Sequence, residues 1–162
     1  MGNMEISFLD DEFIVSKTDL SGKITYGNDL FIRMSGYTEK ELLGAPHNIL
    51  RHSDMPKLIF TLLWEQIKAG KEIFAYVKNK TKQEDYYWVF AHVTPSLNGS
   101  GKVIGYHSVR RKPNDKALQT IIPLYEKLLE AERSGGVNSS LNILEKTLAN
   151  AGKSYDQFII AL

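Results

Sequence analysis

The chain has 162 residues, no cysteine and a net charge of +1 at pH 7. This length allows one domain with a real core and an additional helical piece, while the missing cysteines exclude disulfides, thiolate catalysis and cysteine-ligated metal. Because the charge is close to zero, there is no electrostatic reason to expect nucleic acid or an anionic membrane as a partner.

The first part of the chain predicts a β-hairpin followed by two short helices. Residues 1–12 lack the basic region and apolar run of a signal peptide. Asn28 or Asp29 suits a helix N-cap, and Thr38 with Glu41 forms the capping-box pattern Thr-x-x-Glu. The expected elements are strands at residues 13–17 and 23–26, a helix up to Gly36, and a second helix up to Gly44.

Residues 45–56 differ from an ordinary helix or strand. Pro46 and Pro56 bracket the segment, and each proline removes an amide donor and restricts the residue before it. We therefore expect a short, shaped segment, with one helical turn, that presents polar groups to a pocket. Those polar groups are His47, Asn48, Arg51, His52 and Asp54.

The remaining pattern predicts one longer helix and a three-stranded meander. The helix is expected at residues 55–69, and the strands at residues 73–77, 86–94 and 103–110, with a charged turn at 78–85 and a hairpin loop at 98–101. Two strands, several small helices, one longer helix and three strands indicate an α+β domain with one antiparallel sheet.

Residues 113–162 predict a helical extension. A helix over residues 115–132 contains Pro123, so we expect a kink or a break there. A linker at 134–136 precedes a further helix. The apolar residues of the first helix need a partner surface, which could be the exposed face of the sheet, a second copy of the chain in a homodimer, or another protein. They are Leu118, Ile122, Leu124, Tyr125, Leu128 and Leu129.

Several motifs together carry a resemblance to a known family. They are ITYGNDLF at 24–31, SGY at 35–37, ELLG at 41–44, PHNILRHSDMP at 46–56, VKNK at 77–80, YWV at 87–89, VTP at 93–95 and GYHSVR at 105–110. On these motifs, residues 13–110 resemble a PAS domain, specifically that of bacterial aerotaxis (energy-taxis) receptors. The resemblance implies a PAS fold, with a five-stranded antiparallel sheet, helices on one face and FAD bound between them.

The resemblance also implies a function and a division of the chain. It predicts a redox sensor that feeds a methyl-accepting chemotaxis transducer. Family members usually carry membrane-spanning and signalling segments on the same chain, and we see neither here. We therefore expect a cytoplasmic protein without direct membrane insertion, recruited to the inner membrane by a separate membrane-bound chemoreceptor. The expected parts are an N-terminal segment (1–12), a PAS sensor domain (13–112) and the helical extension (113–162).

The candidate FAD-binding residues combine charge, amide and aromatic groups. Arginine gives paired donors to a phosphate, and asparagine and histidine can address ring edges or hydroxyls. The family typically has a Pro-Trp pair at the start of the third strand, near the flavin. Here Glu72 and Ile73 take these positions, so an aromatic stacking partner is lost. The candidates are Asn28, His47, Asn48, Arg51, His52, Asp54, Phe74, Asn79, Trp88 and His92.

Each assignment has a structural alternative. In the structural alternative, Asn28 caps its helix and Arg51 pairs with Asp54, and neither residue contacts a ligand. Tyr87 and Trp88 alternate along one strand, so at most one of them can face a pocket. His92 or His107 could instead ligate a haem b iron. A cofactor-free adaptor for dimerisation or docking is the other alternative. An enzyme is not expected, because the sequence shows no nucleophile with a paired base, phosphate-binding glycine loop or metal-spaced cluster.

Overall fold

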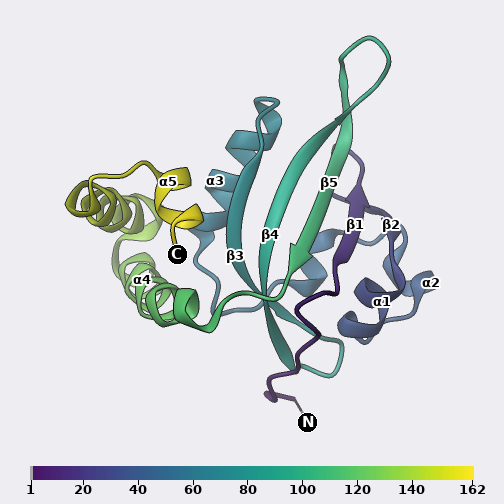
Figure 1. The fold of residues 1–162 in the computed structure, drawn as a ribbon, viewed down its shortest axis with the longest axis horizontal. Helices are drawn as coiled ribbons and strands as arrows, with labels where there is room; N and C mark the ends of the chain where they lie inside the picture. The colour runs from purple at the N-terminus through teal and green to yellow at the C-terminus, as the bar shows by residue number, and fades with distance from the viewer. Residues whose placement is uncertain (1) are drawn as a thin grey trace.

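The computed structural model describes residues 2–162 and contains one five-stranded antiparallel sheet with helices around it (Figure 1). The strand order is β2-β1-β5-β4-β3, so β2 and β3 are the edge strands. This confirms the predicted α+β architecture. The elements are β1 (Ile14–Thr18), β2 (Ile24–Gly27), α1 (Asp29–Ser35), α2 (Glu39–Leu42), the 3₁₀ turn η1 (His47–Leu50), α3 (Lys57–Lys68), β3 (Ile73–Lys80), β4 (Tyr86–Leu97), β5 (Val103–Arg111), α4 (Asp115–Ala151) and α5 (Tyr155–Ile160).

The two short helices begin at the predicted caps. The Asn28 side-chain oxygen accepts hydrogen bonds from the amides of Phe31 (2.9 Å) and Val15 (3.1 Å), so this residue starts α1 and ties it to β1. Thr38 and Glu41 form both bonds of a capping box at α2. The predicted turn in the proline-bracketed segment is η1.

Two strands run further than the sequence pattern predicted. β3 continues through Lys78 and Asn79, which were expected in a turn, because Trp88 and Tyr87 of β4 give them cross-strand partners. β4 continues past Pro95 to Leu97. Pro95 pairs with β5 only, since β3 begins opposite Val93, and a proline is tolerated where one side of the strand has no neighbour.

The helical extension breaks at a different residue from the one predicted. The backbone of α4 stays helical through Pro123, which lies on the exposed side where water can reach the carbonyl that lost its donor. The break comes at Gly136, where φ is 72° and ψ is −167°, a conformation that glycine alone adopts easily. A kink or a break was predicted at Pro123, and the break is wrong. The predicted linker, residues 134–136, ends at Gly136, where the helix does break.

The C-terminal helices pack beside β3 and α3 (Figure 1). Of the six apolar residues predicted to pack, Leu124, Tyr125 and Leu128 are buried, whereas Ile122 is 38% exposed. Ile121 is buried in place of Ile122. The Tyr125 hydroxyl donates to the Tyr76 carbonyl of β3 at 2.6 Å. The extension therefore packs its apolar side chains against the domain and also hydrogen-bonds to the backbone of the edge strand β3.

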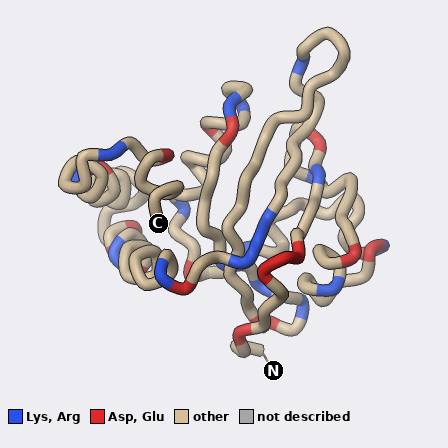
Figure 2. Tube along the Cα trace, viewed as in Figure 1, with Lys and Arg blue, Asp and Glu red and all other residues tan. Residues whose placement is uncertain are grey.

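Charged residues of both signs are spread over the molecule (Figure 2), as the net charge of +1 suggests. Among residues 2–162, none of the helices combines the length and the apolar character that a bilayer crossing requires.

Candidate ligand cavity

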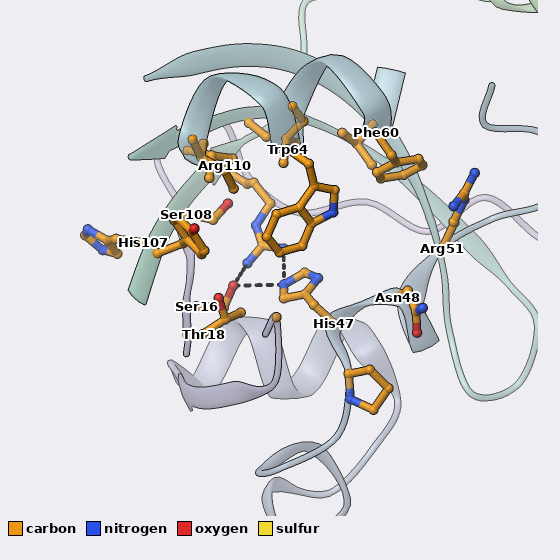
Figure 3. Close-up of a pocket in the computed structure, with 18 of the residues that line it drawn as sticks. Ser16, Thr18, His47, Asn48, Arg51, Phe60, Trp64, His107, Ser108 and Arg110 are labelled. Atoms are coloured by element: carbon orange, nitrogen blue, oxygen red, sulfur yellow. Dashed lines mark hydrogen bonds between the residues drawn. The ribbon is translucent and has the colours of Figure 1, made fainter. Parts of the chain in front are cut away.

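A cavity of about 230 Å³ lies between the inner face of the sheet and the elements η1 and α3 (Figure 3). Its walls combine apolar and aromatic side chains with a few polar groups, which is typical of ligand sites. The volume is below the about 300–1,000 Å³ of pockets that hold drug-sized ligands, so it suits one ring system. The polar side chains are Ser16, Thr18, Ser21, His47, Asn48, Arg51, Asn79, Ser108 and Arg110.

Helix α3 forms the aromatic wall of the cavity. Phe60, Leu63, Trp64 and Ile67 line it at helical spacing, so one face of the helix points inward. Trp64 meets Tyr106 of β5 edge to face, with ring centroids 5.6 Å apart. A side chain at Gly22 would begin 3.2 Å from the Trp64 ring, so this glycine lets the hairpin approach the wall.

The buried Arg110 and Ser16 form a polar cluster with the partly buried His47 at one end of the cavity (Figure 3). The Arg110 guanidinium donates to the Ser16 hydroxyl and lies 3.3 Å from His47 Nε2. The Ser16 hydroxyl is also 3.0 Å from the same ring nitrogen. These contacts fit a neutral imidazole that accepts at Nε2. Burial, reinforced by the positive charge of Arg110, accordingly lowers the pKa of His47 to about 3.

Arg110 is a buried cation without a partner of opposite charge. Its side chain is 3% exposed, and none of its neighbours among residues 2–162 is a carboxylate at ion-pair distance. Burial lowers the pKa of Arg110 to about 10, so the group remains charged near neutral pH. Burying an unpaired charge is costly. A ligand with an anionic or electron-rich edge would offset that cost.

Three buried polar atoms on this side of the sheet have no hydrogen-bond partner within residues 2–162. They are Arg110 Nε, Asn79 Nδ2 and the Tyr87 hydroxyl. Asn79 and Tyr87 face each other across β3 and β4. Burial raises the pKa of Tyr87, which keeps its hydroxyl protonated and able to donate. Arg110 and Asn79 line the cavity, whereas Tyr87 does not. Because buried polar groups are nearly always bonded, the free donors of Arg110 and Asn79 indicate a ligand with acceptors along its edge.

Arg51 and Asn48 lie at the mouth of the cavity (Figure 3). The Arg51 guanidinium stacks over Phe60, 4.2 Å from the ring centroid. It does not take up the pairing with Asp54 that the sequence left open, because Asp54 bonds Lys78 at 2.8 Å. Outside the mouth, an open groove shares Arg51, Phe60 and Trp64 with the cavity, and its further charged residues are Lys57, Lys68 and Glu65.

Four of the ten predicted site residues line the cavity: His47, Asn48, Arg51 and Asn79. Asn28 serves as the cap of α1. His52 and Asp54 lie together outside the cavity, where the His52 Nδ1 accepts the Asp54 amide at 3.0 Å. Burial lowers the pKa of His52, and the hydrogen bond from Lys78 lowers the pKa of Asp54.

Phe74, Trp88 and His92 lie on the opposite face of the sheet, so their predicted contact with a ligand in this cavity is wrong. Side chains alternate along a strand, and the odd-numbered Val77, Asn79, Ala91 and Val93 occupy the cavity side. Phe74 instead stacks on His92, with ring centroids 4.2 Å apart. His107 is among the residues that line the cavity, but its imidazole points away from it (Figure 3). Neither histidine proposed as a haem ligand therefore directs its ring into this cavity.

Sequence reasoning missed Ser16 and Arg110 as site residues. Both lie in strands that were correctly predicted, and both are polar residues at inward positions. Arg110 has the same parity as Tyr106 and Ser108, which line the cavity. A polar residue at an inward-facing position of a predicted strand was the signal that could have identified both as site residues.

The comparison with known families identifies the fold. A family model described as PAS fold matches residues 24–110, which is more than half of the chain. The chain belongs to the PAS family. Similar solved structures include a light-oxygen-voltage domain studied with a flavin analogue (TM-score 0.60, 19% identity, 71% of this chain and 86% of that one). Another is the light state of the blue-light photoreceptor Aureochrome1 LOV (TM-score 0.59, 17% identity, 70% of this chain and 90% of that one).

Two curated relatives are similar in sequence. The aerotaxis receptor of Escherichia coli (strain K12) is 41% identical over 132 residues, covering 82% of this chain and 26% of that protein. The nitrogen fixation regulatory protein of Klebsiella pneumoniae is 29% identical over 97 residues, covering 60% of this chain and 20% of that protein. The chain therefore spans about a quarter or less of the length of these relatives.

Proposed function

We propose that this chain is a redox sensor that binds FAD, with the flavin ring in the cavity, and relays its state to a separate methyl-accepting chemotaxis transducer. The observation that carries the proposal is the buried, uncompensated Arg110 beside a ring-sized cavity. The relatives support it, since one is an aerotaxis receptor and one structural neighbour was studied with a flavin analogue. Both roles are sensory, which favours a sensor over an enzyme.

The donors present suit a flavin ring. Such a ring carries carbonyl oxygens and ring nitrogens along one edge, which match the unpartnered Arg110 Nε and Asn79 Nδ2 in the cavity lining. Ile73 stands where the family has a tryptophan and offers no aromatic ring. Trp64 and Phe60 supply aromatic walls to this cavity instead. A bound flavin would supply reversible uptake of electrons and protons. Arg110 remains cationic and His47 neutral near pH 7, so extra negative charge on the ring would strengthen the hydrogen bonds from Arg110.

The groove outside the mouth supports a dinucleotide over a mononucleotide. Arg51 could hold a phosphate with paired donors, and Lys57 and Lys68 add positive charge further along the groove, where they outnumber the acidic Glu65. The phosphate-bearing part of a ligand whose ring fills the cavity would extend out of it at this point. We place the protein in the cytoplasm, brought to the inner membrane by the transducer.

The absorption spectrum of the purified chain tests the proposal. Bound oxidised flavin absorbs blue light, and heating the protein should release FAD that chromatography separates from FMN. Arg110→Met should reduce flavin content strongly, whereas the exposed neighbour Arg111→Met should not. A Soret band would indicate haem instead. A chain that stays colourless after incubation with FAD and FMN, yet binds a chemoreceptor, would establish the cofactor-free adaptor.

A further inference from the structure

We propose that Glu132 couples the docking of the C-terminal helices to ligand binding in the cavity, with α3 as the shared element. A bound ligand would stabilise the docked position of residues 115–162, and undocking of these residues would weaken ligand binding. The inference rests on the proposed flavin binding, because it concerns the regulation of that site.

Helix α3 lacks an N-cap from its own neighbourhood. The residue before it is Pro56, which forms no side-chain cap. Instead, the amides of Lys57 and Leu58 donate to the two carboxylate oxygens of Glu132, at 2.8 and 3.1 Å. Glu132 comes 75 residues after Lys57. A carboxylate at a helix N-terminus satisfies free amides and opposes the positive end of the dipole, so the start of α3 depends on the docked extension.

The same carboxylate holds the two halves of α4 together. The Ser140 hydroxyl lies 2.9 Å from the Glu132 carboxylate and 2.8 Å from the Val137 carbonyl, so its single proton is shared between these two acceptors, and Ser140 is fully buried. Glu132 precedes the break at Gly136 and Ser140 follows it. Glu132 therefore fixes the angle between these halves and also attaches them to α3.

The next turns of α3 form the cavity wall. Phe60 lies one turn after Lys57, and Phe60 and Trp64 both line the cavity. Arg51 at the mouth stacks on Phe60, and Trp64 contacts the inner strand residue Tyr106. A ligand that orders these side chains also orders the helix whose first amides Glu132 holds. Coupling between two sites is reciprocal, so each event should affect the other.

Undocking would also change what the protein presents to a partner. Tyr125 and Tyr155 donate to the carbonyls of Tyr76 and Phe74 on the edge strand β3, at 2.6 and 2.9 Å. Release of the extension would expose these carbonyls, and a free strand edge readily pairs with another chain. The ligand state would then decide whether that edge is covered.

Hydrogen exchange on the full chain, with and without FAD, tests the coupling. FAD should slow amide exchange in residues 137–162 of the wild type. Glu132→Gln should speed that exchange and weaken FAD binding by about 5-fold or more. The control is Glu130→Gln, which changes an exposed glutamate on the same helix that pairs with Arg133; it should change neither quantity. Ser140→Ala removes one bond without uncapping α3, and should show a smaller effect of the same sign if Glu132→Gln does not fold.

The outcomes separate this inference from the proposed function. If Glu132→Gln or Ser140→Ala speeds exchange while FAD binds with wild-type affinity, Glu132 is only structural and the coupling is overturned. The same holds if FAD binds the wild type and leaves the exchange of residues 137–162 unchanged. A wild-type chain that takes up no FAD would overturn both proposals.

Discussion

Arg110 donates a hydrogen bond from β5 to the hydroxyl of Ser16 on the neighbouring strand β1, and both side chains are buried. The serine gives the guanidinium a neutral partner only, so the positive charge remains free to attract a ligand. A site of this kind sacrifices stability for binding, and the two effects can be measured separately.

Arg110→Met should stabilise the ligand-free chain while lowering its flavin content. Burying an unpaired charge is costly, so an apolar side chain of similar length should raise the free energy of unfolding; replacing buried ion pairs in this way is often neutral or stabilising by about 1–4 kcal/mol. Urea denaturation of ligand-free protein measures the first effect, and the absorbance of flavin per protein measures the second. Lower stability without flavin would mean that the Ser16 and His47 contacts outweigh the cost of the buried charge.

His47 should make stability fall as the pH is lowered. Its folded pKa is about 3, while the unfolded side chain titrates near 6.5. Below about pH 6.5 the unfolded chain binds a proton that the folded chain does not, so the free energy of unfolding decreases with falling pH until about pH 3. The limiting slope is about 1.4 kcal/mol per pH unit.

The contribution of His47 can be isolated with His47→Gln, which does not titrate. Urea denaturation between pH 4 and pH 7, compared with the wild type, gives the slope due to this residue alone. Identical slopes for the two proteins would contradict the lowered pKa.

The local part of the fold could be predicted from the sequence, and the reasons are local. Asn28 and the pair Thr38 and Glu41 cap helices through neighbours within four residues, so a short pattern contains the whole interaction. The cluster of Arg110 and Ser16 joins residues 94 positions apart. No short pattern reports that contact.

The wrong side assignments have one common cause. Phe74 and His92 were chosen by residue type, while the side that a strand residue faces depends on parity. For Trp88 the alternation with Tyr87 was recognised, but the sequence did not show which of the two faces inward. Asn79 was chosen as well and lines the cavity, although the segment around it was expected to be a turn. The two strands are longer than their apolar patterns suggest, because pairing with a neighbour extends them.

Phe74→Ala should leave the flavin spectrum and flavin affinity unchanged. The ring lies on the face away from the cavity and stacks on His92 and Phe90, so its loss should reduce stability by about 0.5–1.5 kcal/mol from the lost ring pairs, plus the lost burial. Absorption spectra and urea denaturation measure the two quantities. A shifted flavin spectrum would show that the outer face communicates with the ligand.

Arg51→Ala should weaken the binding of FAD more than the binding of riboflavin. Riboflavin has the ring without phosphates, and Arg51 lies at the mouth where a phosphate would leave the cavity. Loss of a charge-assisted hydrogen bond corresponds to about 1.5–3 kcal/mol, which is roughly 10- to 150-fold in Kd. Arg33→Ala, an exposed arginine on α1, is the control. Equal weakening of both ligands by Arg51→Ala would place the phosphates elsewhere.

The double variant Tyr125→Phe with Tyr155→Phe should loosen the C-terminal helices while leaving the cavity intact. Both phenylalanines keep the packed rings, whereas the carbonyls of Phe74 and Tyr76 lose their donors. Each lost hydrogen bond should cost about 0.5–1.5 kcal/mol. Limited proteolysis should therefore cut residues 115–162 faster than in the wild type. Tyr26→Phe changes a half-exposed tyrosine on the other edge strand and controls for the loss of a hydroxyl.

Because β3 would expose its carbonyls in the double variant, size-exclusion chromatography of that variant should also reveal more self-association. Unchanged proteolysis and an unchanged elution volume would show that side-chain packing alone holds the extension on the sheet edge.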